Sequence, residues 1–166
     1  TCVILDNGSV SCWGIGSNGR LGNGDSSDRT TPTLISSLGA GRTATAVSAG
    51  YDHTCAILDN GLVSCWGRGN LGQIGNGDSS DKTTPTLTNS LGAGRTAIAI
   101  SAGYGHTCAI LDNGLVSCWG GGGNGKLGNG DVYTKVVPTL TSSLGAGRTA
   151  VAIETAGHTC AILDDG

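Results

Sequence analysis

Residues 53–67, HTCAILDNGLVSCWG, form the stretch that decides the fold. Two short apolar runs flank residues 59–61 (DNG), and such a triplet between apolar runs is typical of a β-hairpin. We expect a three-residue loop with its glycine in the left-handed region, which places Cys55 directly opposite Cys65. A two-residue turn would instead place Cys55 opposite Trp66. Because the two cysteines are equidistant from the turn, we predict the first register and a disulfide that closes the hairpin.

The composition indicates a chain rich in strands and loops. The 166 residues include 31 Gly and three each of Trp and Tyr, but no Phe and no Met. This length can bury a core, and that core must consist of Ala, Val, Ile, Leu, Trp and paired cysteines. The apolar runs are short, alternate with polar residues and are bounded by Gly, Pro, Asn and Asp, a pattern that excludes long helices.

Charge and hydropathy exclude two classes of partner. The formal net charge is −3, with nine Lys and Arg spread along the chain, whereas a nucleic-acid-binding protein needs clustered positive charge. No apolar run approaches the roughly 18 residues that a membrane span requires. We therefore expect neither nucleic-acid binding nor a membrane span.

The seven cysteines follow a regular spacing. Six of them form pairs with nine residues between the partners: Cys2 and Cys12, Cys55 and Cys65, Cys108 and Cys118. Regular pairing predicts disulfides and an oxidising compartment, so we expect an extracellular or cell-surface location. The partner of Cys160 would fall beyond Gly166, and we interpret this cysteine as unpaired by truncation rather than as a reactive thiol.

The same unit occurs three times and begins a fourth time. It starts at Thr1, Thr54, Thr107 and Thr159, so the period is 53, 53 and then 52 residues. We divide one continuous array into repeat 1, repeat 2, repeat 3 and the start of a fourth repeat, at residues 1–53, 54–106, 107–158 and 159–166. Such a chain has the pattern of a segment of a longer array or of the unit of a polymer.

Each repeat predicts about four strands. In the second repeat the hairpin strands are expected at 54–58 and 62–66, followed by a Gly-rich loop at 67–78. A short edge strand is expected at 85–88, which begins with a proline. Residues 97–103 alternate Ala with Ile and predict an inner strand near an axis. Four strands in about 50 residues are typical of a propeller blade, so the expected fold is all-β.

A family pattern recurs in all three repeats, with its second element disturbed to LGQIG at residues 71–75 of the middle repeat. It reads Ala-Gly-x-x-His-Thr-Cys-Ala-Ile-Leu-Asp-Asn-Gly-Leu-Val-Ser-Cys-Trp-Gly and then Gly-x-Leu-Gly-Asn-Gly-Asp. It resembles the repeat of the regulator of chromosome condensation family, and its cysteines resemble the family's secreted bacterial branch. The resemblance implies a seven-bladed β-propeller, which three repeats cannot close. Either further repeats, several chains in one ring, or an open filament-like array would complete the structure.

Residues that recur in each repeat are interpreted as scaffold. His53, His106 and His158 cannot gather around one metal when they are a full repeat apart, so we expect structural hydrogen bonds at the blade junctions. The oxygen-rich stretches 23–28 and 76–81 lack the bidentate Glu of a calcium loop and are better explained as turns. The recurring arginines are expected to pair with nearby Asp on the blade surface: Arg42, Arg95 and Arg148.

Residues that break the repeat are better candidates for recognition, because scaffold needs are shared between blades. The candidate partner-binding residues are Arg68, Asn70, Val132, Tyr133, Lys135 and Glu154. An extracellular chain also offers candidate glycosylation sites, and these are Asn7, Thr30, Thr31, Thr83 and Thr84.

Together these observations predict a non-enzymatic extracellular scaffold without cofactor, metal or catalytic residues. Its expected partners are copies of itself, in a filament, or another surface protein. One alternative is a closed secreted propeller that binds a protein partner in the manner of an inhibitor. Nucleotide exchange, which the family resemblance also implies, is disfavoured by the paired cysteines and the acidic balance.

Overall fold

The computed structural model describes residues 1–165 and contains thirteen strands there. Two single 3₁₀ turns, η1 (Ser17–Gly19) and η2 (Gly123–Gly125), lie in the Gly-rich loops of the first and third repeats. The strands are β1 (Cys2–Ile4), β2 (Val10–Gly14), β3 (Arg29–Leu34), β4 (Ala44–Ala49), β5 (His53–Leu58), β6 (Val63–Gly67), β7 (Lys82–Leu87), β8 (Ala97–Ala102), β9 (His106–Leu111), β10 (Val116–Gly120), β11 (Lys135–Leu140), β12 (Ala150–Thr155) and β13 (Thr159–Leu163).

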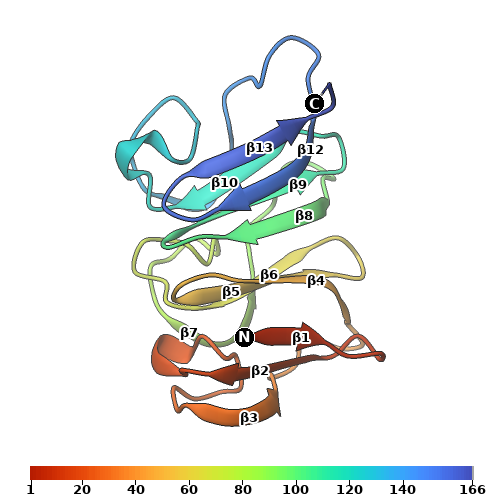
Figure 1. The fold of residues 1–166 in the computed structure, drawn as a ribbon, viewed down its shortest axis with the longest axis vertical. Helices are drawn as coiled ribbons and strands as arrows, with labels where there is room; N and C mark the ends of the chain where they lie inside the picture. The colour runs from red at the N-terminus through yellow and green to blue at the C-terminus, as the bar shows by residue number, and fades with distance from the viewer. Residues whose placement is uncertain (166) are drawn as a thin grey trace.

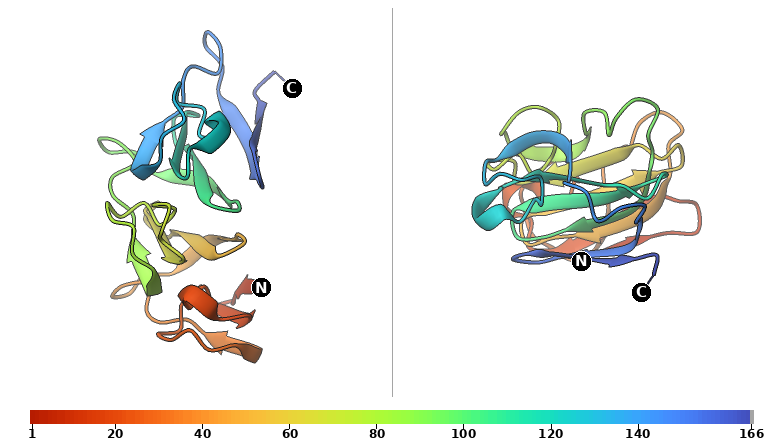
Figure 2. Two further views of the ribbon diagram at one scale, coloured as in Figure 1. Left: turned by 90° about the vertical axis from the view of Figure 1, so that its left-hand side faces the viewer. Right: turned by 90° about the horizontal axis from the view of Figure 1, so that it is seen from above.

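These strands form four antiparallel sheets that stack in sequence order. The two middle sheets are complete blades with the orders β4-β5-β6-β7 and β8-β9-β10-β11. The first sheet has three strands, β1-β2-β3, and the last has two, β12-β13. The first and last sheets lie at opposite ends of the stack (Figure 1), and Figure 2 shows the stack from two further sides. The predicted all-β fold of propeller blades in an unclosed array is confirmed over residues 1–165.

The central hairpin has the predicted register. Cys55 pairs with Cys65 and Ile57 with Val63 across β5 and β6. Gly61 has a φ of +75° and its N–H donates to the carbonyl of Leu58, which closes the three-residue loop. Each of the three predicted cysteine pairs is joined by a disulfide, with Cα–Cα distances of 4.2, 4.1 and 4.1 Å.

The structure corrects the predicted start of one edge strand and places the predicted inner strand at the opposite edge of its sheet. The edge strand of the second repeat begins at Lys82, not at Pro85, so the predicted start is wrong by three residues. Pro85 sits inside β7 because the outer side of this strand has no partner strand, and the missing N–H is not needed. The predicted inner strand is β8, which lies at the opposite edge of its sheet and packs against β4 and β12 of the neighbouring sheets.

The core lies between the sheets. One cluster joins the first two sheets around Trp66, and a second joins the two middle sheets around Trp119. The third cluster, between β8–β11 and the two-stranded sheet, contains Leu127 and Ile153 but no aromatic residue among those described. Across residues 1–165, no helix has the length and apolarity to cross a membrane.

Candidate functional site: an open tryptophan seat

Each internal blade junction seats a tryptophan against a glycine of the preceding repeat. Trp66 and Trp119 have no exposed surface. A Cβ built on Gly75 would lie 2.6 Å from Nε1 of Trp119, and Gly22 stands in the same relation to Trp66. The indole can therefore approach only a backbone without a side chain. Trp119 Nε1 also donates a 2.9 Å hydrogen bond to the carbonyl oxygen of Gln73.

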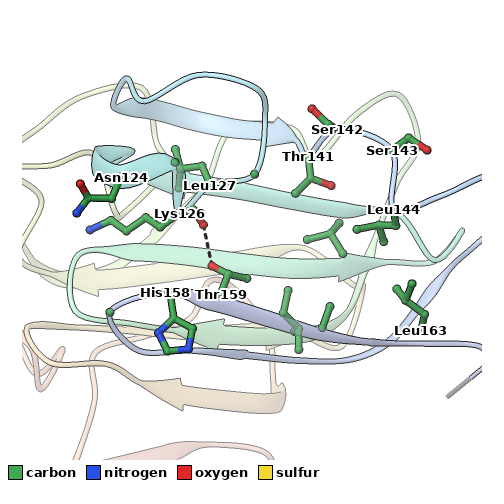
Figure 3. A pocket seen from close by; sticks show the side chains of 16 residues that line it. Asn124, Lys126, Leu127, Thr141, Ser142, Ser143, Leu144, His158, Thr159 and Leu163 are labelled. Carbon is green, nitrogen blue, oxygen red and sulfur yellow. Dashed lines mark hydrogen bonds between the residues drawn. The ribbon is translucent and has the colours of Figure 1, made fainter.

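The last junction has the same walls but no tryptophan. A pocket of about 530 Å³ opens beside β13, and Figure 3 shows its lining side chains from close by. We call this pocket the open seat and define it by six apolar residues: Val116, Leu127, Leu144, Ile153, Ala161 and Leu163. In the preceding junction the equivalent residues surround Trp119: Val63, Ile74, Leu91, Ile100, Ala109 and Leu111.

The glycine of the open seat is also in place. Gly128 is the equivalent of Gly22 and Gly75, with a φ of +66°, and it lines the pocket. A Cβ built there would meet only Thr141, with the nearest atom at 3.7 Å. The space that an indole fills at the two inner junctions is therefore free at this end of the stack.

The sheet at the other end of the stack has a tryptophan that no neighbouring sheet of the described chain covers. Trp13 of β2 occupies the position of Trp66 and Trp119, yet it is only partly buried because no sheet precedes its own. The described residues thus contain a seat without a tryptophan at one end and a tryptophan without a seat at the other.

A chain of hydrogen bonds, which we call the polar relay, crosses the second and third junctions between the sheets. The Thr107 hydroxyl donates to the carbonyl oxygen of Gln73 at 2.9 Å, and Nε2 of His53 lies 2.8 Å from the same hydroxyl oxygen. Because the hydroxyl proton is used by the carbonyl, His53 must donate from Nε2. His106 and Thr159 repeat the arrangement at 2.8 Å. The predicted structural hydrogen bonds of these two histidines at blade junctions are therefore present in the structure, while His158 is exposed.

Both relay histidines are held neutral. Burial lowers the pKa of His53 to about 4, and burial likewise lowers the pKa of His106 to about 4. In each ring the other nitrogen, Nδ1, is buried and has no hydrogen-bond partner. A proton there would place a buried charge without a partner, which is costly. The relay consequently serves as a structural joint at neutral pH.

Sequence reasoning missed a buried carboxylate close to this relay. Asp52 is 6% exposed, and its two oxygens pair with Arg20 at 2.5 Å and with Arg68 at 3.1 Å. Arg20 follows β2 of the first sheet, whereas Asp52 directly precedes β5 of the second, so the group links two blades. The sequence signal that could have revealed Asp52 is a break in the repeat. The equivalent residues before His106 and His158 are both glycine.

The repeat-breaking candidates do not form one site. Arg68 belongs to the Asp52 group, whereas Asn70 is exposed in the following loop. Tyr133 and Val132 are 71% and 58% exposed, and Lys135 pairs with Asp131 at 2.7 Å. Glu154 is exposed on β12, where it lies opposite Cys160.

Sequence reasoning also missed a pair of exposed tyrosines. Tyr51 and Tyr104 are 67% and 64% exposed, and their ring centroids lie 5.6 Å apart in an edge-to-face arrangement. They occupy equivalent turns before β5 and β9, and the Tyr51 N–H donates to the carbonyl of Gly103. The two turns are thus fixed side by side.

The remaining recurrent polar residues are used in turns and surface ion pairs. Arg42 pairs with Asp59 at 3.2 Å, and the expected pairing of the other two recurrent arginines with nearby Asp is also present. The oxygen-rich stretch 76–81, which we interpreted as a turn rather than a calcium loop, is held by hydrogen bonds. The Asp78 carboxylate accepts the Ser80 N–H, and the hydrogen bond from Lys82 lowers the pKa of Asp78. Within residues 1–165, no group of three metal-ligating side chains comes together.

The glycosylation candidates lie near the surface. Asn7 is exposed in the first hairpin turn, where its Oδ1 accepts the Ser9 N–H. The threonine candidates lie on the edge strands, where Thr30, Thr31 and Thr84 are exposed and Thr83 is half-buried. Modification of these residues stays a prediction.

Comparison with known proteins identifies the repeat. The model of the regulator of chromosome condensation (RCC1) repeat matches residues 7–57 and 60–110, and a second model of this repeat matches residues 44–73 and 97–126. The ultraviolet-B receptor UVR8 of Arabidopsis thaliana is 38% identical over 166 residues, 99% of this chain and 37% of the receptor. The human E3 ubiquitin-protein ligase HERC2 is 39% identical over 146 residues, 86% of this chain and 3% of the ligase.

Solved structures show the same fold. Prp20p of Saccharomyces cerevisiae superposes with a TM-score of 0.83 and 19% identity, over 95% of this chain and 40% of Prp20p. Human WBSCR16 gives a TM-score of 0.56 and 18% identity, over 97% of this chain and 55% of that protein. The chain therefore spans well under two thirds of each of these four proteins.

Proposed function

Because the chain belongs to the regulator of chromosome condensation repeat family, we propose that it is a non-enzymatic extracellular scaffold that assembles head to tail with copies of itself. The propeller-blade fold supports a role in protein interaction. The finer parts of the proposal are the location, the filament and the self-association. They rest on the repeated blade junction and on the cysteines.

The observation that carries the proposal is the repetition of one blade junction through the described residues. The open seat has the walls and the glycine that receive Trp119 inside the chain. The carbonyl oxygen of Lys126, which accepts from Thr159, is the equivalent of the Gln73 carbonyl that accepts from Trp119. Trp13 at the other end belongs to a hairpin of nearly the same sequence. The contact that the chain makes twice within itself is thus one that a blade of another copy can also make. Such a head-to-tail contact is heterologous and propagates unless its rotation closes a ring.

The disulfides support an extracellular or cell-surface location. The three hairpins β1–β2, β5–β6 and β9–β10 each carry a cross-strand disulfide, and disulfides persist in oxidising compartments. They also stiffen a chain that has only three tryptophans and no phenylalanine. Both features suit an array that must last outside the cell.

A second candidate is a closed propeller that binds a protein partner. It is favoured by the exposed Tyr51–Tyr104 pair, because tyrosine is enriched at protein interfaces. Prp20p, which has the same fold, is described with binding to Gsp1p and histones. A nucleotide-exchange role by analogy with such relatives is a third candidate, and it would need an intracellular location that the three disulfides disfavour.

The mass of the oxidised chain in solution tests the proposal. Light scattering across a concentration series, together with negative-stain images, should show species that grow with concentration. The variant Trp13→Ala should stay monomeric because it removes the side chain that fills the seat. Tyr133→Ala is the matched control, since it removes an aromatic residue that is 71% exposed away from the seat. A wild-type chain that remains a monomer, or a Tyr133→Ala variant that assembles as poorly as Trp13→Ala, would contradict the proposal.

A further inference from the structure

Two exposed tyrosines meet on the surface where the two middle sheets join. Tyr51 lies in the turn between β4 and β5, and Tyr104 lies in the equivalent turn between β8 and β9. Their rings are 67% and 64% exposed, and the ring centroids are 5.6 Å apart. Among the described residues this is the one contact between two aromatic rings, and Tyr133 stands apart from it. Because both rings face solvent, core packing does not explain why they lie together.

The backbone of Tyr51 is fixed on both sides of its side chain. Its N–H donates to the carbonyl oxygen of Gly103 at 3.2 Å, and its carbonyl oxygen accepts from Nη1 of Arg20 at 2.9 Å. A Cβ built on Gly50 would lie 2.6 Å from the same Gly103 oxygen, so the two turns are in direct contact. Gly103 directly precedes Tyr104. Only the two side chains remain free to rotate, and each ring therefore meets the other at a high effective concentration.

We infer that Tyr51 and Tyr104 are a modification site, at which a dityrosine bond fastens the two middle blades to each other. The oxidant is hydrogen peroxide acting through a haem peroxidase, which removes single electrons from exposed phenols. Both tyrosines belong to the same copy of the chain, so the inference does not rest on head-to-tail assembly. A covalent tie between blades would suit the durable extracellular scaffold proposed above.

The covalent step forms one carbon–carbon bond between the two rings. Each tyrosine loses one electron to the peroxidase and its phenolic proton to solvent, which both exposed rings can reach. In the two phenoxyl radicals, much of the unpaired electron lies on the ring carbons next to the phenolic carbon, and one such carbon of each ring joins the other. The hydrogen on each joined carbon then leaves as a proton while the phenolic oxygen takes one up, which restores both aromatic rings. The two electrons and two protons removed overall reduce one peroxide molecule to two water molecules.

Peptide mapping after mild oxidation tests the inference. The disulfide-bonded chain is treated at low concentration with hydrogen peroxide and a plant haem peroxidase. Trypsin cleaves after Arg and Lys, which places Tyr51 in residues 43–68 and Tyr104 in residues 96–126. Mass spectrometry should find these two peptides joined, with two hydrogens fewer than their sum, in a chain that runs as a monomer on denaturing gels. Dityrosine fluorescence that comes only from links through Tyr133, or a yield that rises with protein concentration, would overturn the inference.

Phenylalanine variants and the unfolded chain serve as matched controls. Tyr51→Phe and Tyr104→Phe should each lower the dityrosine fluorescence of the monomer about tenfold, whereas Tyr133→Phe should leave it unchanged. The same treatment in denaturing urea should lower the yield of the joined peptides about tenfold, because the two turns are no longer held together. Equal yields from the folded and the unfolded chain would show that the fold does not prepare the site, and would overturn the inference.

Urea unfolding shows whether the bond fastens the blades. The bond would join residues that are 53 positions apart, and closing such a loop restricts the unfolded chain, so the urea midpoint should rise. Tyr51→Phe treated with the same oxidant is the control, since it meets the peroxidase without forming the link. A treated wild type that is no more stable than this control would overturn the inference. A chain that links its blades but never assembles would refute head-to-tail assembly and leave the modification site standing.

Discussion

Replacing His53 by glutamine should remove a pH dependence of about 3 kcal/mol from the free energy of unfolding. Burial lowers the pKa of His53 from 6.5 to about 4. Between these two values the unfolded chain binds a proton at this side chain and the folded chain does not. The stabilisation is therefore fully present above about pH 6.5 and is lost as the pH falls towards about 4. At about 1.4 kcal/mol for each unit of pKa, the whole difference amounts to about 3 kcal/mol.

Urea unfolding followed by tryptophan fluorescence at about pH 7 and about pH 4 measures this difference. Glutamine keeps an N–H that can donate to Thr107 but cannot take up a proton, so the variant should lose less stability on acidification than the wild type. Carboxylates titrate in both chains, and their contribution cancels in the comparison. The exposed His158 provides the control His158→Gln, which should behave as the wild type. Equal losses of stability in His53→Gln and the wild type would refute the assignment of a buried neutral histidine.

Two further substitutions test the blade junctions by urea unfolding. Gly75→Ala should cost about 2–4 kcal/mol, because the new Cβ would lie 2.6 Å from Trp119 at a φ of +78°. Gly128→Ala has a similar φ but free space and should cost about 1 kcal/mol, and equal costs would contradict the vacant seat. Asp52→Asn should cost about 2 kcal/mol because it breaks two ion pairs at a buried carboxylate. Asp59→Asn, at an exposed pair, should cost less than about 1 kcal/mol, and a cost as large as that of Asp52→Asn would argue against a special role for the buried group.

The local parts of this structure could be predicted from the sequence, and the parts between blades could not. The register of β5 and β6 follows from residues 59–61 and from two cysteines at equal distances from the turn, so short-range rules suffice. The contact between Trp119 and Gly75 joins different repeats, and no local pattern states which glycine faces which indole. The ion pair of Asp52 likewise depends on Arg20, which belongs to the preceding blade. The period reveals equivalent positions, but only the packing of sheets shows what those positions touch.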